Sequence, residues 1–183
     1  LRLGGGLQLD TPFGLFRVPN ISPHPGDGIG GWSMLEFVNA MQKGISPSGR
    51  YYYPSFPYTS YARMKTRDVM DLKAFVDGLP PIAGQPQDHD LAFPYSIRRG
   101  LGLWKRRYLA ADPVIETTSA DSQLLAGRYL VEDAGHYCEC HTPRDIFGGL
   151  DTNRWLAGAP TLDGEGGVPD LTPAGKNVSA WSA

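Results

Sequence analysis

Apolar positions recur at helical spacing in only a few stretches of the chain. Residues 33–44 begin with Ser33 and Glu36, the pair of a capping box, and end at Gly44. Residues 66–78 begin with Thr66 as the expected cap and end at Gly78. The pattern therefore predicts two helices. Their expected core residues are Met34, Leu35, Phe37, Val38 and Met41 in the first helix and Val69, Leu72, Phe75 and Val76 in the second.

A third helix is predicted over residues 119–135, and its expected core residues are Leu124, Leu125, Tyr129, Leu130 and Val131. Residues 83–118 are mostly polar and rich in Pro and Arg, with one short amphipathic segment, "SIRRGLGLWKRRYL". No strand is predicted, because apolar and polar residues nowhere alternate clearly. The chain is therefore expected to be mainly α, in small loop-rich helical folds.

A short motif occurs twice. "PNISP" begins at Pro19 and is followed by Trp32 and Ser33, and "PDLTP" begins at Pro169 and is followed by Trp181 and Ser182. The motif repeats at a period of about 150 residues, which suggests two copies of one domain. The expected organisation is the C-terminal part of a first domain in residues 1–82, a linker in residues 83–118 and the N-terminal part of a second domain in residues 119–183.

Composition and charge narrow the possible functions. The 183 residues carry a net charge of −2, which favours neither nucleic acid nor an anionic membrane as a partner. No apolar run is long enough for a membrane span, and no signal peptide is recognised. With 23 Gly and 16 Pro the chain is loop-rich, and small loop-rich domains need a disulfide, metal or cofactor to stabilise them. The two cysteines are too close together to join distant loops, so a cofactor is expected.

The stretch "HYCECH" holds the candidate chemistry. Cys140 and His141 match the second half of the C-x-x-C-H motif for haem attachment, but Tyr137 stands where the first cysteine belongs. Cys138 faces another side of that helical turn. Three interpretations remain open: a haem site with one thioether, a zinc or iron–sulfur site, and two structural or disulfide-linked cysteines beside a surface histidine. The second is disfavoured, because four ligands within six residues cannot all converge.

Met64 is the other candidate ligand. It follows a loop rich in Pro and Tyr and precedes the second predicted helix, where a small haem protein presents a thioether sulfur to iron. Core packing is the alternative role for this side chain.

Several blocks together resemble the multi-haem cytochrome c subunits of bacterial membrane-associated dehydrogenases, such as those for alcohol, aldehyde and gluconate. They are residues 11–37, 49–81, 93–104, 127–149 (which include "EDAGHYCECHTPRD") and 168–173. The resemblance implies tandem class I cytochrome c-like domains wrapped around covalent haem c, with at least two haems in the intact protein.

The resemblance also implies residue roles. Met64 is expected to be the sixth iron ligand of the first haem, while Cys140 forms the thioether and His141 the iron bond of the second. Trp32 and Arg144 are expected near propionates. The full set of expected cofactor contacts is Pro19, Asn20, Ile21, Gly30, Trp32, Tyr58 and Tyr61 together with Cys138, Cys140, Pro143 and Arg144.

The same resemblance assigns two further positions and one departure. Gly127 and Tyr129 match the positions at which the first helix of such a domain crosses its last helix. Tyr137 departs from the family pattern, so either Cys140 alone holds the second haem or residue 137 has been misassigned.

The implied function is electron transfer from a partner flavo- or quinoprotein dehydrogenase to a quinone or a terminal oxidase, by a non-catalytic subunit on the periplasmic side of the membrane. Any membrane association is expected to lie outside this chain. Two alternatives are an oxidoreductase with one open haem and a scaffold module whose second domain has lost its haem.

Overall fold

The computed structural model describes residues 3–84, 87–161, 166–176 and 178. Two compact units are present. Unit 1 comprises Leu1–Phe56 and Lys65–Gly102, and unit 2 comprises Pro57–Met64 and Leu103–Ala183. The segment Pro57–Met64 therefore belongs to unit 2, although its sequence neighbours on both sides belong to unit 1. The domain boundaries inferred from the repeat stay a prediction.

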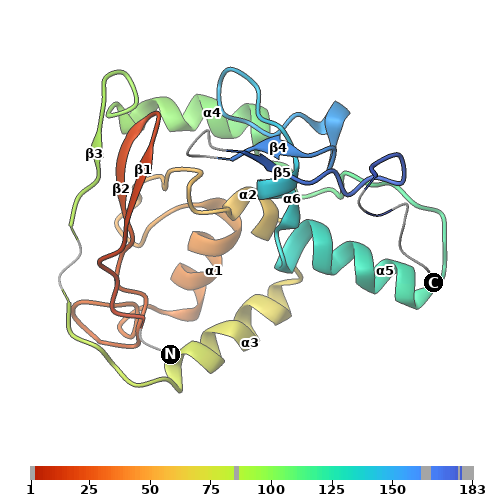
Figure 1. Cartoon of the computed structure of the whole chain (residues 1–183). Helices are drawn as coiled ribbons and strands as arrows, with labels where there is room; N and C mark the ends of the chain where they lie inside the picture. The colour runs from red at the N-terminus through yellow and green to blue at the C-terminus, as the bar shows by residue number, and fades with distance from the viewer. Residues whose placement is uncertain (1–2, 85–86, 162–165, 177, 179–183) are drawn as a thin grey trace. The chain divides into compact units, whose positions relative to one another are not determined.

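Unit 1 contains a small antiparallel sheet that the sequence pattern did not predict (Figure 1). Strands β1 (Gln8–Thr11) and β2 (Gly14–Arg17) form a hairpin, and β3 (Asp90–Leu91) pairs with β2. Only Phe16 of these strands is buried. A sheet with so few buried side chains leaves no apolar alternation to detect, which explains why the strands were missed.

The two helices predicted for unit 1 are confirmed. Helix α1 (Met34–Lys43) has both hydrogen bonds of the Ser33–Glu36 capping box and ends at Gly44 with φ of 57°. Helix α3 (Thr66–Asp77) ends at Gly78, but its N-cap is Lys65, so Thr66 is one position inside the helix. The two helices pack against each other.

The expected cores of these helices need correction. The buried residues are Phe37, Ala40 and Met41 in α1 and Val69, Lys73 and Val76 in α3. Four residues predicted to be in the core are exposed: Met34, Leu35, Leu72 and Phe75, the last of them by 63%. The reason is that the α1–α3 contact uses a narrow stripe of each helix. Lys73 enters this stripe because its stem is apolar and its ammonium reaches Asp77 at 2.6 Å.

The helices of unit 2 are short, and α4 runs across the boundary between the two units. The helices and helical turns of unit 2 are α2 (Tyr58–Tyr61), α5 (Ser122–Tyr129), the π-helical turn η2 (Leu130–Ala134), α6 (Tyr137–His141) and the 3-10 turn η3 (Thr152–Arg154). The 3-10 turn η1 (Arg98–Gly100) belongs to unit 1 and leads into α4 (Leu101–Tyr108). Strands β4 (Ala159–Pro160) and β5 (Gly167–Val168) form a second antiparallel pair.

The core predicted for residues 119–135 is wrong. None of Leu124, Leu125, Tyr129, Leu130 and Val131 is buried, and Leu130 is 57% exposed. Instead Glu132, Asp133 and Cys138 lie in the interior of unit 2. Hydrogen bonds satisfy these polar groups, so burial follows polar partners here rather than apolar periodicity.

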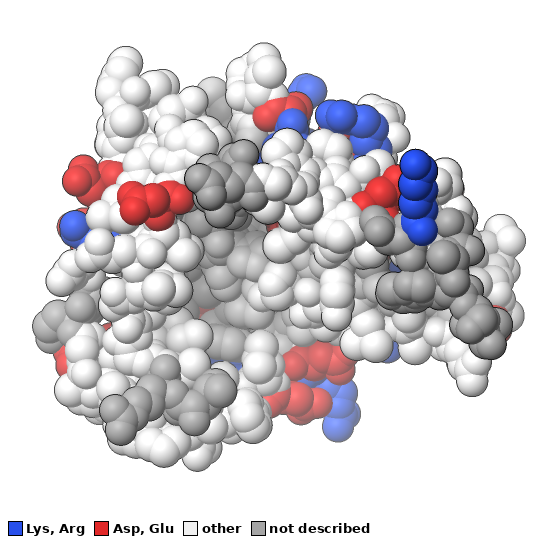
Figure 2. Space-filling model, viewed as in Figure 1, with Lys and Arg blue, Asp and Glu red and all other residues white. Residues whose placement is uncertain are grey.

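The surface carries charges of both signs. Figure 2 shows Lys and Arg side chains and Asp and Glu side chains in small groups on a mostly uncharged face. In the part of the chain that the structure describes, no helix has the length and apolar character needed to cross a membrane.

Candidate functional site

Helix α6 presents Cys138 and Cys140 to opposite environments. Tyr137 is 53% exposed and Cys140 is exposed, whereas Cys138 is completely buried. Successive residues of a helix point about 100° apart, so residues two positions apart face nearly opposite directions. Both cysteines are free thiols, so the disulfide-linked interpretation is wrong for this structure.

Cys138 is held in the interior by polar contacts. Its Sγ lies 3.3 Å from the Ser60 Oγ and 3.5 Å from the Glu132 carbonyl oxygen. Burial raises the pKa of the Cys138 thiol from 9.0 to about 11, and the contact with Ser60 only partly opposes this. A buried neutral thiol is a poor nucleophile and a poor ligand. Cys140 is therefore the thiol that an external cofactor could reach, and a cofactor contact by Cys138 remains only a prediction.

His141 is oriented by a backbone carbonyl. Its Nδ1 lies 2.8 Å from the carbonyl oxygen of Pro169. A carbonyl only accepts hydrogen bonds, so Nδ1 carries the proton and Nε2 keeps its lone pair in the neutral ring. The Gly158 N–H also donates to the His141 carbonyl at 2.8 Å. Fixing one ring nitrogen in this way is typical of metal-ligating histidines.

Arg144 is engaged with Glu139. Its Nη2 lies 2.8 Å from Glu139 Oε2, and its Nη1 donates to the carbonyl of Gly148 at 2.9 Å. Pro143 beside it is buried. Glu139 already neutralises this guanidinium, so the expected role of Arg144 beside a propionate stays a prediction.

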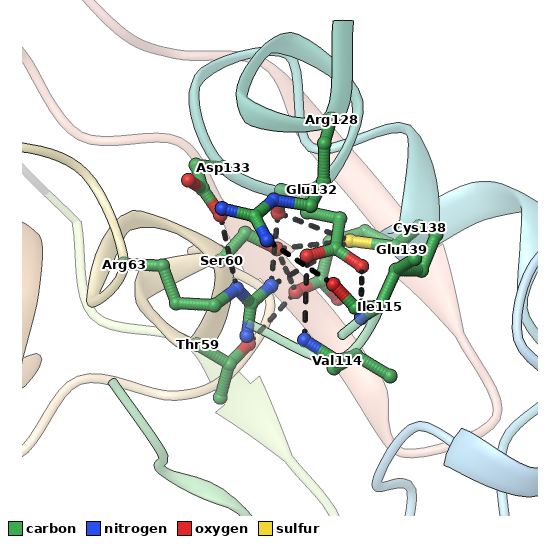
Figure 3. A network of polar contacts seen from close by, with 10 residues as sticks. All are labelled: Thr59, Ser60, Arg63, Val114, Ile115, Arg128, Glu132, Asp133, Cys138 and Glu139. Atoms are coloured by element: carbon green, nitrogen blue, oxygen red, sulfur yellow. Dashed lines mark hydrogen bonds and ion pairs between the residues drawn. The ribbon is translucent and has the colours of Figure 1, made fainter. Parts of the chain in front are cut away.

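A polar network joins α6 and η2 to the segment Pro57–Met64 (Figure 3). Glu139 Oε1 accepts hydrogen bonds from the hydroxyls of Thr59 at 2.7 Å and Ser60 at 3.0 Å. Arg63 pairs with Asp133 at 3.1 Å and donates to the Glu132 carbonyl at 2.9 Å. The sequence indicated none of these contacts, because the partners lie 69 to 80 residues apart.

The two acidic residues of η2 have different tasks in this network. The Glu132 carboxylate accepts from the backbone N–H groups of Val114 at 3.3 Å and Ile115 at 2.8 Å, so it holds the chain that precedes α5. Burial raises the pKa of Asp133 above its usual range, although Arg63 opposes the rise. Both carboxylates are therefore internal structural groups.

The expected contacts before α3 also lie in unit 2. Tyr58 is completely buried and Met64 is buried, while the Tyr61 hydroxyl lies 3.4 Å from Nδ1 of His136. The Met64 N–H donates to the Tyr61 carbonyl at 3.1 Å, so the methionine closes the turn that α2 begins. Burial of Met64 is compatible with both core packing and iron ligation.

The expected contacts of the first haem in unit 1 lie in and beside the Pro19–Pro23 loop. The buried Asn20 amide donates to the carbonyls of Ile82 at 2.7 Å and Gly84 at 3.3 Å. Gly30 approaches this loop so closely that a Cβ would lie 2.1 Å from the Pro23 carbonyl oxygen. Ile21 is exposed, and Trp32 is half-buried. Asn20 and Gly30 thus shape the loop itself.

The sequence repeat is also a local structural repeat. The Ser22 N–H donates to Asn20 Oδ1 at 2.9 Å, and the Thr172 N–H donates to Asp170 Oδ1 at 2.7 Å, which forms the same Asx turn after each proline. A glycine at positive φ lies against each turn. Gly5 has φ of 76° and Gly158 has φ of 81°, and a Cβ on either would meet the Val carbonyl oxygen, Pro carbonyl carbon and Asx nitrogen of the adjacent turn. Trp181 and Ser182 of the second copy lie outside the described residues.

Comparison with known proteins identifies the relatives of this chain. It is 51% identical over 185 residues to a "Diheme cytochrome c-type" protein of Cereibacter sphaeroides, with all of this chain and 60% of that protein covered. It is 35% identical over 167 residues to the cytochrome c subunit of a quinone-type alcohol dehydrogenase of Gluconobacter oxydans, covering 87% and 35% of the two chains.

The cytochrome subunit of fructose dehydrogenase from Gluconobacter japonicus is 33% identical over 183 residues, covering 98% and 37%. This chain is therefore similar to a dihaem cytochrome c and to cytochrome subunits of bacterial dehydrogenases. It spans 60% or less of the length of these relatives. No protein-family model matches the chain.

A metal site made by protein side chains alone is not assembled. Within residues 3–84, 87–161, 166–176 and 178, no three His, Cys, Asp or Glu side chains gather in a way that could hold a metal ion. Cys138 and Cys140 face apart, in agreement with the expectation that the "HYCECH" residues cannot all converge. Cys140 is exposed, and the neighbouring His141 at the end of α6 is half-buried.

Proposed function

We propose that this chain is part of an electron-transfer cytochrome c that carries haem c in tandem class I cytochrome c-like domains. It relays electrons from a partner dehydrogenase to a quinone or a terminal oxidase. The observation that carries the proposal is the geometry at α6, where the His141 ring is held by a hydrogen bond to the Pro169 carbonyl beside the exposed thiol of Cys140. Homology to multi-haem cytochromes c supports the same conclusion.

The residues of α6 fit a haem that is attached through one thioether. Cys140 presents a thiol, and the neighbouring His141 has an accessible nitrogen lone pair whose tautomer is set by the Pro169 carbonyl. Tyr137 and Leu130 add exposed apolar surface nearby in the sequence, of the kind that a porphyrin covers. One covalent bond is sufficient, because ligation and apolar burial contribute independently to retention of the cofactor.

The repeated turn supports the tandem arrangement. Pro19 and Pro169 begin equivalent Asx turns in the two units, and each turn is covered by a glycine at positive φ. If the Pro169 turn orients the histidine of one haem, the Pro19 turn occupies the corresponding position in the other domain. On this proposal Met64 is the sixth ligand of that other haem, with Tyr58 and Tyr61 beside it.

When bound, haem c supplies a one-electron Fe(III)/Fe(II) couple. The chain's own residues determine its environment. His141 would offer Nε2 to the iron of the second haem, and Met64 would offer a thioether sulfur to the iron of the first. Ligation by a histidine and a methionine raises the reduction potential of a haem. A haem held by both a histidine and a methionine would leave no position on its iron for a substrate, which supports electron relay rather than catalysis.

The names of the relatives support a proposal for the partner and the compartment. The cytochrome subunits among them are named for alcohol and fructose dehydrogenases. We therefore assign this chain a flavo- or quinoprotein dehydrogenase as its electron donor and the periplasmic side of the membrane as its location.

Paired cysteine variants test the proposal. Cys140→Ala is expected to lose one covalent haem per protein, whereas Cys138→Ala is expected to keep the full number, because only Cys140 faces outward. Haem is counted by the pyridine haemochrome assay on protein produced with its maturation system. Equal haem content in the two variants would contradict the one-thioether site, and no haem at Cys140 in the unmodified protein would favour the scaffold alternative.

The ligands are tested by spectroscopy on the same material. Met64→Ala is expected to abolish the near-infrared sulfur–iron band of the first haem. Carbon monoxide is expected not to bind the reduced unmodified protein. Rapid binding of carbon monoxide to one haem would instead favour the oxidoreductase alternative.

A further inference from the structure

One buried carboxylate joins the two groups of proposed haem ligands. Glu139 lies between Cys138 and Cys140 in α6, two residues before His141. Its side chain is 8% exposed, and it bonds the hydroxyls of Thr59 and Ser60, which precede Met64 (Figure 3). Burying a carboxylate without hydrogen-bond partners costs free energy of folding. The hydrogen bonds of Glu139 are therefore favoured over an arrangement in which they are broken.

The link between Glu139 and Met64 is short and continuous. From Ser60, the backbone hydrogen bonds of Arg63 N–H to the Ser60 carbonyl and of Met64 N–H to the Tyr61 carbonyl, both 3.1 Å, complete the turn to Met64. Arg63 adds a second attachment through Asp133 at 3.1 Å. The segment that carries Met64 is thereby fastened to the chain that carries Cys140 and His141.

The hydrogen bonds of Glu139 have a defined direction. An ionised carboxylate only accepts, so the hydroxyls of Thr59 and Ser60 both donate to it. On the other side, Nη2 of Arg144 forms an ion pair with Oε2 of Glu139 at 2.8 Å. Thr59 and Ser60 are therefore held by charge-assisted bonds, which are stronger than bonds between neutral groups.

We propose that Glu139 is a positioning residue for Met64, so that a residue inside the attachment motif of the second haem stabilises the methionine–iron bond of the first. This inference rests on the proposed function, because it requires Met64 to be an iron ligand. It also means that, within unit 2, the segment Pro57–Met64 is held to the helix that carries Cys140 and His141. Loosening the connection at Glu139 releases Met64, although residues 58–64 themselves are unchanged.

Competition with imidazole measures the effect. Imidazole replaces methionine on iron, and its apparent affinity rises with the fraction of protein in which Met64 is detached. The purified haem-loaded protein is titrated with imidazole while the near-infrared sulfur–iron band is recorded. Glu139→Ala is expected to bind imidazole at the first haem about tenfold more tightly, because two charge-assisted bonds to the Met64 segment are lost.

Substitutions outside the haem motif give a matched test. Thr59→Val keeps the shape of the side chain but removes its donor, and it is expected to tighten imidazole binding about three- to fivefold. Thr59→Ser restores a hydroxyl and is expected to remain within about twofold of the unmodified protein. If Glu139→Ala fails to fold, this Thr59 pair decides the question alone.

Asp151→Ala is the control. Asp151 forms an ion pair with Arg154 at 2.8 Å in the same unit and has no bond to Thr59 or Ser60 in the network. The inference is overturned if Glu139→Ala or Thr59→Val changes imidazole affinity no more than Asp151→Ala does. A sulfur–iron band that survives Met64→Ala overturns the role of Met64 in the proposed function, and the inference with it. If the sulfur–iron band is lost in Met64→Ala but imidazole affinity is unchanged in Glu139→Ala and Thr59→Val, the inference is overturned and the proposed role of Met64 is not.

Discussion

The Pro19–Pro23 loop of unit 1 and the Pro169–Pro173 loop of unit 2 share one turn but are fastened to different parts of the chain. In unit 1, Asn20 and Ser22 bind the backbone around Ile82, beyond the end of α3. In unit 2, the Pro169 carbonyl accepts a hydrogen bond from His141. Another contact is common to both loops, because the Ile21 N–H donates to the Leu3 carbonyl and the Leu171 N–H donates to the Leu156 carbonyl, both at 2.9 Å.

The difference shows that the same Asx turn can form hydrogen bonds with different parts of the chain. Its backbone is set locally by proline and by an Asn or Asp side chain, so it forms in both units. Its other groups then bind the backbone beyond α3 in unit 1 and the His141 side chain in unit 2. On the proposed tandem arrangement, the two units show the two attachments of one domain type.

The glycines that cover the turns give the largest expected effect. Gly5→Ala and Gly158→Ala each place a Cβ within 2.9 Å of the turn backbone at positive φ. Each is expected to lower the free energy of unfolding by about 2–4 kcal/mol, since strain and a steric clash add. Urea unfolding followed by circular dichroism measures this. Gly6 also has a positive φ but no atom near its Cβ, so Gly6→Ala is the control for strain alone. Equal losses at all three positions would show that the close approach to the turn is unimportant.

The second prediction separates the two loops. Asn20→Ala removes the Asx turn and two bonds to Ile82 and Gly84 in a buried site, and is expected to cost about 2–3 kcal/mol. Asp170→Ala removes the Asx-turn bond alone, and is expected to cost about 1 kcal/mol. The same unfolding measurement applies. A larger loss for Asp170→Ala would mean that the unit 2 loop depends on its turn more than on the contact with His141.

The third prediction concerns the helix that carries His141. Because burial holds the pKa of Cys138 near 11 in the folded protein, the unfolded chain loses this proton first as pH rises from 9.0. The neutral thiol therefore stabilises the fold below about pH 9, and the contribution of about 2–3 kcal/mol disappears as pH passes 11. In Cys138→Ala this part of the decrease in the free energy of unfolding at alkaline pH should be absent. Unfolding free energies of both proteins between pH 8 and 11 provide the comparison, and parallel pH curves would contradict it.

The sequence was sufficient for features that depend on neighbouring residues. The capping box of Ser33 and Glu36, the stop at Gly44, the repeated Pro-Asx motif and the adjacent Cys140 and His141 all arise within a few residues. These features use local hydrogen bonds and fixed spacings, so they are recognisable without the fold. The homology to cytochromes c followed from several such local blocks occurring in the same order.

Tertiary structure decided what depends on distant partners. Periodicity placed Leu35, Phe75 and Leu130 in a core, but their helices bury other stripes or rest on a polar interior. Which of the two cysteines is buried depends on which side of α6 is covered. The hydrogen bonds between Pro169 and His141 and between Thr59 and Glu139 join residues far apart in the chain. Local spacing cannot specify these contacts, because burial and long-range hydrogen bonds are properties of the packed chain.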